Sequence, residues 1–306
     1  MKIVSPKESA SLTRLYFYAG FMQLIIRGIV PRKLDELDFK SFGIAALMSI
    51  STYIAVALIM LYPFKNRFGT YLSTVFPTTY INYIISGTPV FNALWPPKES
   101  VLVNMMMIAN DLISSPIFLF LVGIYNAIEN NKKRRANGLP PEKFSFSIIG
   151  NVLLGVIKSP ILIGNVVEII YSACKIPYPI FIDRYLQFAG DMVFALALVG
   201  VGIFLAQNSL ISCDWRQFIF CMITRCFIGP ALAGLWCKAL GMSARTSRQC
   251  IIIGAQPTAV ASFAITSTNH LGEGCASTMI LWTTILCVPT IIVWFAILDG
   301  LHLYVE

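Results

Sequence analysis

Long apolar stretches alternate with short polar segments along the whole chain. Nine of these stretches are about as long as a helix that crosses the hydrocarbon core of a bilayer, roughly 20 residues. They lie near residues 10–30, 43–63, 69–93, 101–125, 157–173, 180–206, 217–239, 247–268 and 276–303. The connections between them are short and carry the charges. This pattern predicts an all-α polytopic integral membrane protein with about nine transmembrane helices.

The composition agrees with a membrane protein and excludes two other classes. Hydrophobic residues make up 57% of the 306 residues and charged residues only 12%, whereas soluble domains contain about 25% charged residues. A soluble globule of this size could not bury so much apolar surface, and a disordered chain would be far more polar. We therefore expect a multi-pass protein of the plasma membrane or an endomembrane.

The net charge of +8 does not indicate a nucleic-acid-binding surface. The only dense basic run, at residues 132–135, lies in a polar stretch of the central part of the chain. A short basic loop of this kind is typical of the cytoplasmic side of a membrane, where it faces anionic lipid. We therefore expect membrane lipid among the partners and no nucleic acid.

The sequence contains no recognisable metal site, cofactor site or catalytic centre. It has two His residues, and none of its eight Cys residues forms a CxxC pair, so no zinc site is predicted. No His pair, Ser–His set or cluster of metal ligands falls inside an apolar stretch. We therefore expect a protein that is not an enzyme and that carries no metal and no cofactor.

Two of the nine stretches carry helix-breaking residues well inside the apolar run. These residues are Pro77, Asn82, Gly87 and Pro89 in the third stretch, and Gly254, Gln256 and Pro257 in the eighth. Proline removes a backbone donor and frees a carbonyl group. In a membrane, free backbone groups are tolerated only inside protein or beside a watery cavity. Both helices are therefore predicted to be broken, although transmembrane helices also carry Pro and Gly as simple kinks.

The two broken stretches hold matching places in two halves of the chain. The first repeat covers residues 1–128, a basic central cytoplasmic loop residues 129–145, and the second repeat residues 146–306. Each broken stretch is the second to last of its half. Matched interruptions are typical of secondary transporters built on an inverted repeat, whose half-helix N-termini suit an anionic substrate. The halves contain four and five stretches, whereas the halves of an inverted repeat need equal, odd numbers of helices, so the pattern alone leaves one helix unaccounted for.

Several segments resemble the auxin efflux carrier family of membrane transporters, which includes plant auxin carriers and bacterial relatives. NYIISGTPVF, residues 82–91, is similar to the N-T-G-x-x-G-x-P crossover of the family's fourth helix, with Asn82, Gly87 and Pro89 at the defining places. GAQPTAVASFAI is similar to the A-x-P crossover of the ninth helix, with Pro257 as its proline. SPKESASLTRLYFYAGFMQLIIRGI, KSPILIGNVVEII and CASTMILWTTILCVPTIIVWFAIL are similar to the second, sixth and tenth helices. Together these segments cover nearly the whole chain.

The resemblance implies a bundle of ten helices in an inverted repeat, five plus five, similar to sodium/proton antiporters and bile-acid symporters. The two broken helices would cross near mid-membrane. It further implies a secondary transporter of small organic anions, auxin-like or other carboxylic acids, that works by alternating access. The substrate-binding crossover would consist of Asn82, Gly87, Pro89, Gln256 and Pro257.

The chain departs from the family pattern in four respects. It begins at what would be the second helix, so we expect the first to be missing, either from the protein or through a start-site error in the gene model. Met22 and Ala195 stand where the family has Pro, and Tyr83 replaces the usual Thr after the crossover Asn. A degenerate member that no longer transports is therefore one alternative, and a multi-span receptor or channel is another. Relatives of this architecture are often dimers, which makes a second copy of the chain an expected partner.

Asn110 and Asp111 lie inside the fourth apolar stretch, one helix after the first crossover. They are similar to the Asn-Asp pair of sodium/proton antiporters. A charge at bilayer depth is costly and usually marks a pathway, a relay or an ion pair. The sequence therefore indicates a role in proton or cation coupling, against the alternative of a buried carboxylate that pairs with Arg225 or with an amide.

Overall fold

The computed structural model describes residues 38–140, 179–207 and 210–304, most of 150–174, and the single residues Ser11 and Gln23 before them. Within these residues the chain is helical, and one isolated bridge between Ile81 and Thr258 is its only β-pairing. The predicted apolar stretch near 10–30, Met22 included, lies outside the described residues apart from those two positions.

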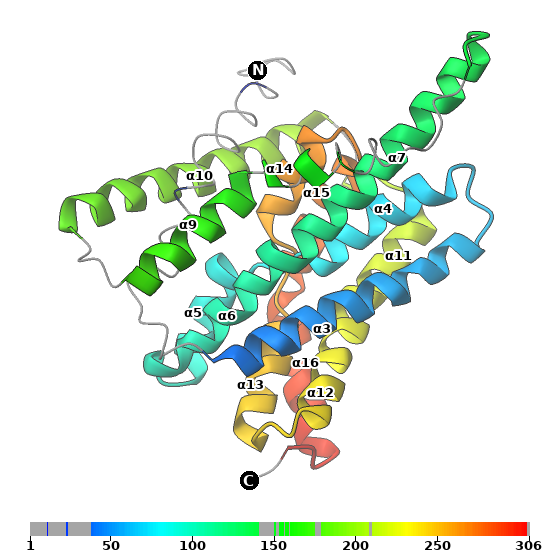
Figure 1. Ribbon diagram of the computed structural model, residues 1–306. Helices are drawn as coiled ribbons and strands as arrows, with labels where there is room; N and C mark the ends of the chain where they lie inside the picture. The colour runs from blue at the N-terminus through cyan, green and yellow to red at the C-terminus, as the bar shows by residue number, and fades with distance from the viewer. Residues whose placement is uncertain are drawn as a thin grey trace.

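Helices follow the predicted apolar stretches from residue 39 onward (Figure 1). The first half contains α3 (Phe39–Val56), η3 (Ala57–Leu61), α4 (Arg67–Thr79), η4 (Tyr83–Gly87), α5 (Thr88–Leu94), η5 (Pro97–Ser100), α6 (Val101–Ala109), η6 (Asn110–Ser114) and α7 (Ser115–Ala136). The second half contains α9 (Pro160–Cys174), α10 (Ile180–Gln207), α11 (Trp215–Ile223), η7 (Thr224–Ile228), α12 (Gly229–Ala239), α13 (Ala244–Gly254), α14 (Val260–Thr268), α15 (Glu273–Ile285) and α16 (Cys287–Gly300). The segments η4, η6 and η7 are single π-helical turns, which often occur at functional sites.

Three continuous helical runs in the described part of the chain are long and apolar enough to cross a membrane. They are Phe39–Leu61, Pro97–Ala136 and Trp215–Ala239. The helices α15 and α16 together make a fourth candidate, bent by 62° at the break between them. Pro289 explains the bend, because it has no N–H for the carbonyl of Ile285 and its ring clashes with that carbonyl. The total of nine spanning helices and the inverted repeat stay predictions.

The basic segment that follows the fourth apolar stretch begins as helix. Residues 129–136, which the sequence assigns to the central loop, continue α7, and this end of α7 projects from the bundle (Figure 1). Lys132 pairs with Glu129 one turn earlier, and three further cations occupy the last turn, where the helix dipole favours positive charge.

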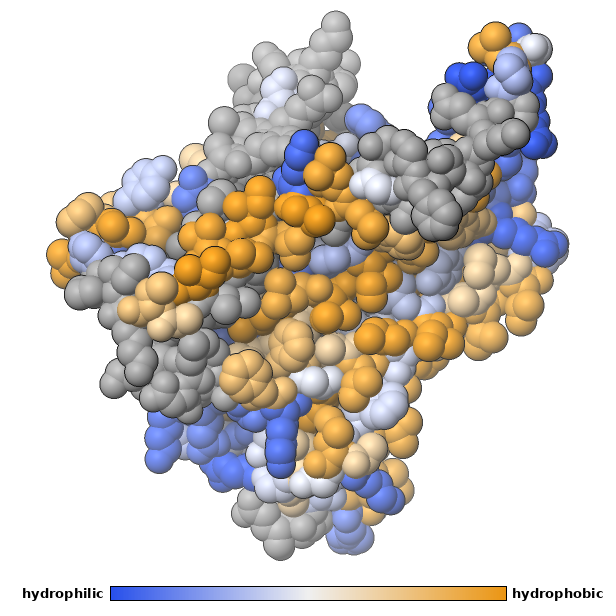
Figure 2. All heavy atoms as spheres, in the orientation of Figure 1, coloured by the Kyte–Doolittle hydropathy of each residue, from blue (hydrophilic) through white to orange (hydrophobic). Residues whose placement is uncertain are grey.

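Apolar side chains dominate the middle of one face of the molecule (Figure 2). Figure 2 shows them over the central part of the face, whereas polar residues gather at the lower end and on the projecting end of α7. Along the first spanning run, Ile54, Leu58 and Leu61 are 69%, 61% and 77% exposed. A soluble protein rarely exposes apolar patches of this kind, but lipid tails solvate them.

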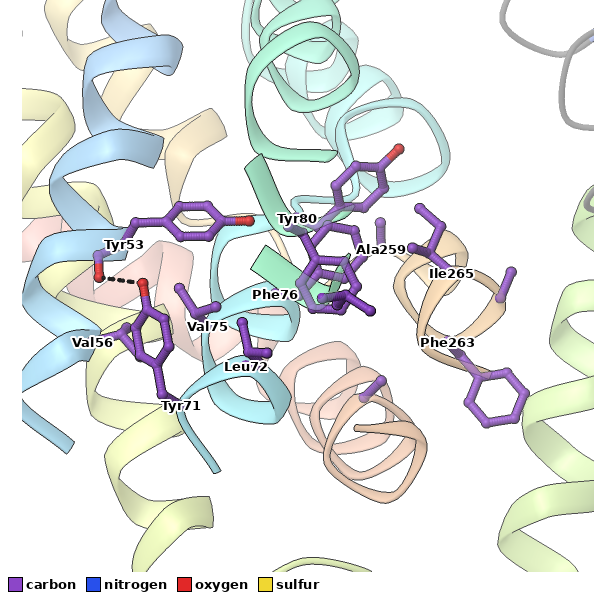
Figure 3. Packing of buried hydrophobic residues seen from close by; sticks show 14 of the residues in the cluster. Tyr53, Val56, Tyr71, Leu72, Val75, Phe76, Tyr80, Ala259, Phe263 and Ile265 are labelled. Carbon is purple, nitrogen blue, oxygen red and sulfur yellow. Dashed lines mark hydrogen bonds between the residues drawn. The ribbon is translucent and has the colours of Figure 1, made fainter. Parts of the chain in front are cut away.

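The largest apolar core joins the two halves of the chain. Its buried members come from α3, α4, α7, α14 and α15, and they include Tyr53, Val56, Leu72, Val75, Phe76, Phe118, Phe263, Ile265 and Ile280 (Figure 3). Phe76 stacks on Phe118 with ring centroids 4.1 Å apart, and the hydroxyl of Tyr71 donates to the carbonyl of Tyr53 at 3.1 Å. Because α4 and α14 share this core, their broken ends are brought to the same place.

Candidate functional site

The first broken helix is interrupted just after α4. This helix ends at Thr79, and the backbone is extended at Tyr80 before η4 begins at Tyr83. Asn82 starts the new helical segment: its side-chain oxygen accepts from the amide of Ile85 at 3.1 Å, and its carbonyl accepts from the amide of Gly87 at 3.0 Å. Asn is among the residues best suited to this capping role. The predicted break is confirmed, a few residues after Pro77 rather than at it.

The second broken helix has the same design. The helix α13 ends at Gly254 and α14 begins at Val260, which leaves residues 255–259 between them. Pro257 lies in this gap, and Ala259 is extended just before α14. The predicted break in the eighth stretch is therefore also confirmed.

The two breaks cross and supply each other's missing hydrogen bonds. The amide of Asn82 donates to the carbonyl of Pro257 at 2.8 Å, and the amide of Ala259 donates to the carbonyl of Tyr80 at 2.9 Å. These two bonds form an antiparallel bridge between Ile81 and Thr258. This reciprocal pairing is how irregular backbone can be tolerated within a bundle that faces lipid.

A side-chain contact strengthens the crossing. The hydroxyl of Thr258 donates to the carbonyl of Pro77 at 2.7 Å, across 181 positions of sequence. In turn, the amide of Thr258 donates to the hydroxyl of Thr283 at 3.0 Å. Thr258 therefore ties the second break both to α4 and to α15.

The structure brings four of the five predicted crossover residues together. Asn82, Gly87, Gln256 and Pro257 are buried at the crossing, and a side chain on Gly87 would begin 3.6 Å from Cγ of Gln256. Pro89 is exposed near the start of α5 and does not belong to this buried group.

Two polar side chains that the sequence interpretation missed complete this group. The hydroxyl of Ser86 donates to Oε1 of Gln256 at 2.8 Å. The thiol of Cys287 lies 3.7 Å from the same oxygen. Ser86 stands directly before the crossover Gly87, which is the one local signal that could have pointed to it. Cys287 belongs to a different apolar stretch, so only the tertiary structure reveals its position.

Asn110 and Asp111 are buried in η6 and contact the first break. The side-chain amide of Asn110 donates to the carbonyl of Ile81 at 2.8 Å, and a carboxylate oxygen of Asp111 accepts from the hydroxyl of Tyr80. The alternative that Asp111 pairs with Arg225 is not what the structure shows, because the guanidinium of Arg225 is directed to backbone carbonyls. The predicted pair is thus attached to the crossover itself.

Two cavities lie away from the crossover. One, of about 310 Å³, is lined by Trp95, Arg245, Arg248, Phe295 and Tyr304, and both of its arginines are ion-paired, with Glu99 and Asp299. The other, of about 360 Å³, is lined by Ser73, Ser212, Cys213, Gln217, Gly272, Glu273, Gly274 and Cys275. A hydrogen bond with Cys275 and burial raise the pKa of Cys213, so this thiol stays protonated and poorly nucleophilic at neutral pH. Neither cavity includes a crossover residue, and among the described residues no cluster of His, Cys, Asp and Glu could hold a metal ion.

Comparisons with known proteins show the family to which the chain belongs. Residues 15–295 match the family described as membrane transport protein. Auxin efflux carrier component 8 of Arabidopsis thaliana is 22% identical over 98% of this chain and 92% of that protein. Component 5 of the same plant is 20% identical over 87% of this chain and 82% of that protein. A probable auxin efflux carrier component 3b of Oryza sativa subsp. japonica is 25% identical over 45% of this chain and 23% of that protein. The chain therefore belongs to the membrane transport protein family, the family of the auxin efflux carriers.

Proposed function

We propose that this protein is a secondary transporter that moves small organic anions, auxin-like or other carboxylic acids, through the crossover by alternating access. Membership of a membrane transport family supports transport, and the names of the similar plant carriers support this substrate class. The observation that carries the proposal is the crossing of two broken helices beside the polar pair Ser86 and Gln256.

Electrostatics at the crossover favours an anion. New helical segments start at Tyr83 and at Val260, and the N-terminus of a helix carries a positive partial charge. No side chain caps the start of α14, so its first amides keep donor capacity for a ligand. A carboxylate would be held by these amides and by neutral polar side chains, without covalent chemistry.

Asn110 and Asp111 are proposed as the coupling residues. Asp111 accepts a hydrogen bond from Tyr80, the residue at which the first break starts. Loss or gain of a proton on Asp111 would change that bond, and with it the geometry of the extended segment that pairs with the second break. Protonation could thereby be linked to substrate binding.

Transport by the full chain in proteoliposomes tests the proposal. We expect saturable uptake of radiolabelled indole-3-acetate, competed by other small carboxylates. Asn82→Ala and Gln256→Ala should lower uptake at least tenfold, because both side chains are buried at the crossing. Asn92→Ala is the matched control, since Asn92 is an exposed amide on the nearby α5.

The alternative functions give different outcomes in this experiment. A non-transporting family member, or a receptor, would give no uptake of indole-3-acetate or of any carboxylate in a broad panel. A channel would give flux that does not saturate. Wild-type uptake by both crossover variants would show that the substrate binds elsewhere. A homodimer stays our proposal for the assembly, and cross-linking in the same vesicles would detect it.

A further inference from the structure

A guanidinium group lies at the break in the second broken helix, where its first part, α13, ends. Arg225 belongs to the π-turn η7 and is 2% exposed. Its Nη2 donates to the carbonyl of Gly254, the last residue of α13, at 2.8 Å, and also to the carbonyl of Gln256 in the break. Terminal carbonyls of a helix have no partner within the helix and carry negative partial charge. Arg225 therefore caps α13 at the crossover with a positive charge.

No described carboxylate balances this charge. None of the ion pairs among the described residues includes Arg225, and the groups close enough to affect it electrostatically are Tyr83, Cys226 and Cys287. Nε of Arg225 and the hydroxyl of Tyr83 are both buried and both lack a hydrogen-bond partner. A buried charge that is held only by backbone dipoles is costly. In a membrane such a group usually has a function.

The surrounding helices hold the guanidinium in place. Its π-turn is tied to α16, because the indole nitrogen of Trp294 donates to the carbonyl of Cys226, the next residue, at 2.8 Å. A side chain on Gly229 would begin 3.4 Å from Nη1 of Arg225. Both hydrogen bonds to carbonyls come from one nitrogen, Nη2, which carries two N–H donors.

The carbonyls that accept hydrogen bonds from Arg225 lie at a helix C-terminus and in an unwound segment. Carbonyls in these positions bind a free cation in some other transporters. In carriers with broken helices, unwound carbonyls and half-helix C-termini coordinate Na⁺. We propose that Arg225 is a built-in cation of the crossover, whose guanidinium takes the place of a bound metal cation at the end of α13. The crossover then keeps a permanent positive charge without binding Na⁺ at these carbonyls. The part of this inference that concerns an anionic substrate rests on the proposed function.

Refilling the cavity left by Arg225→Ala tests the proposal. We expect purified Arg225→Ala to unfold roughly 5 °C or more below wild type. A low, non-denaturing concentration of guanidinium chloride should restore most of that loss, whereas choline chloride at the same ionic strength should not. The unfolding temperature of the wild type should be the same in sodium chloride and in choline chloride. Arg67→Ala, which removes an exposed arginine at the start of α4, is the matched control and should not respond to guanidinium.

Two results with Arg225→Ala would overturn the proposal. One is an Arg225→Ala protein as stable as wild type, and the other is a destabilised variant on which guanidinium acts no more than choline. If Arg225→Ala does not fold, Arg225→Gln provides the second variant, because its neutral amide can still donate to a carbonyl. We expect Arg225→Gln to fold and to take up indole-3-acetate at least tenfold more slowly than wild type, and Arg225→Lys to retain more of the uptake. Uptake by Arg225→Gln equal to that of the wild type would refute the role of the charge.

These measurements separate the inference from the proposed function. Rescue by guanidinium depends only on the cavity at the end of α13 and needs no substrate. If rescue occurs but the wild type transports no carboxylate, the built-in cation stands and the proposed function fails. If the wild type transports carboxylates but guanidinium does not rescue Arg225→Ala, the proposed function stands and the built-in cation fails.

Discussion

The two broken helices meet the same backbone requirement with different chemistry. Neutral groups complete the first break: Asn82 caps its new helical segment, and Asn110 and Thr258 donate to its carbonyls. A charged group completes the second, because Arg225 donates to two of its carbonyls. The first break also has the titratable neighbour, Asp111, through Tyr80.

At the crossover, neutral groups therefore define the backbone geometry of the first break, and among the described residues a charged group donates to backbone carbonyls only at the second. Neutral amides and hydroxyls satisfy carbonyls and define the extended segment without adding a charge. A guanidinium makes stronger, charge-assisted hydrogen bonds, and its charge acts over a longer range in a medium of low dielectric constant. We infer that the first break defines the geometry of the site and responds to protons, whereas the second provides a permanent positive charge.

The largest expected effect compares the two breaks directly. Arg225→Met removes the partner of two buried carbonyls, each of which costs about 1–3 kcal/mol when left unpaired. Asn110→Leu should cost no more than about 1 kcal/mol, because the carbonyl of Ile81 also accepts from the amide of Tyr83. Moreover, the side-chain oxygen of Asn110 has no hydrogen-bond partner to lose. The free energy of unfolding of both variants, measured in the same detergent, would give this difference. Equal losses of stability would show that the two breaks do not differ in this respect.

Thr258→Val should have the next largest effect. It removes the hydroxyl that joins the second break to the carbonyl of Pro77, at a cost of about 1–2 kcal/mol. Thr266→Val is the matched control, since the buried hydroxyl of Thr266 bonds only to carbonyls within its own helix. Thermal unfolding should rank Thr258→Val clearly below Thr266→Val. The reverse order would mean that the crossing does not depend on this bond.

Ser86→Ala should lower affinity rather than stability. Loss of the bond to Gln256 leaves a buried amide oxygen with weaker partners, worth about 1 kcal/mol or roughly fivefold in KM for indole-3-acetate. Uptake kinetics would measure this change. A matched Ser73→Ala variant, near the second cavity and away from the crossing, should leave KM unchanged.

Asp111→Asn should have the smallest effect on folding. The amide oxygen of Asn can accept the hydrogen bond from Tyr80, so the free energy of unfolding should change by about 1 kcal/mol or less. The pH dependence of uptake should nevertheless flatten, because the proton-binding group at the first break is gone. An unchanged pH profile would remove Asp111 from coupling and leave it as a structural acceptor.

The positions of both breaks could be predicted from the sequence because their causes are local. Pro257 lacks a backbone donor and lies in the second break, and Asn82 is suited to restart a helix after the first, although Pro77 itself still lies inside α4. The partners of the freed groups could not be predicted, since Ser86 and Gln256 are 170 positions apart and Thr258 and Pro77 are 181 apart. The residues around Arg225 in the sequence do not indicate whether its side chain caps a helix or pairs with Asp111.

The sequence by itself determined the class of this protein and the elements that matter most. Apolar length, low charge and matched helix breakers depend on neighbouring residues, and they were sufficient for a membrane transporter with a crossover near Asn82 and Pro257. Only the tertiary structure decided which groups meet there. Free carbonyls inside a membrane protein take whichever donor the packing of distant helices brings within reach, and at the end of α13 that donor is Arg225.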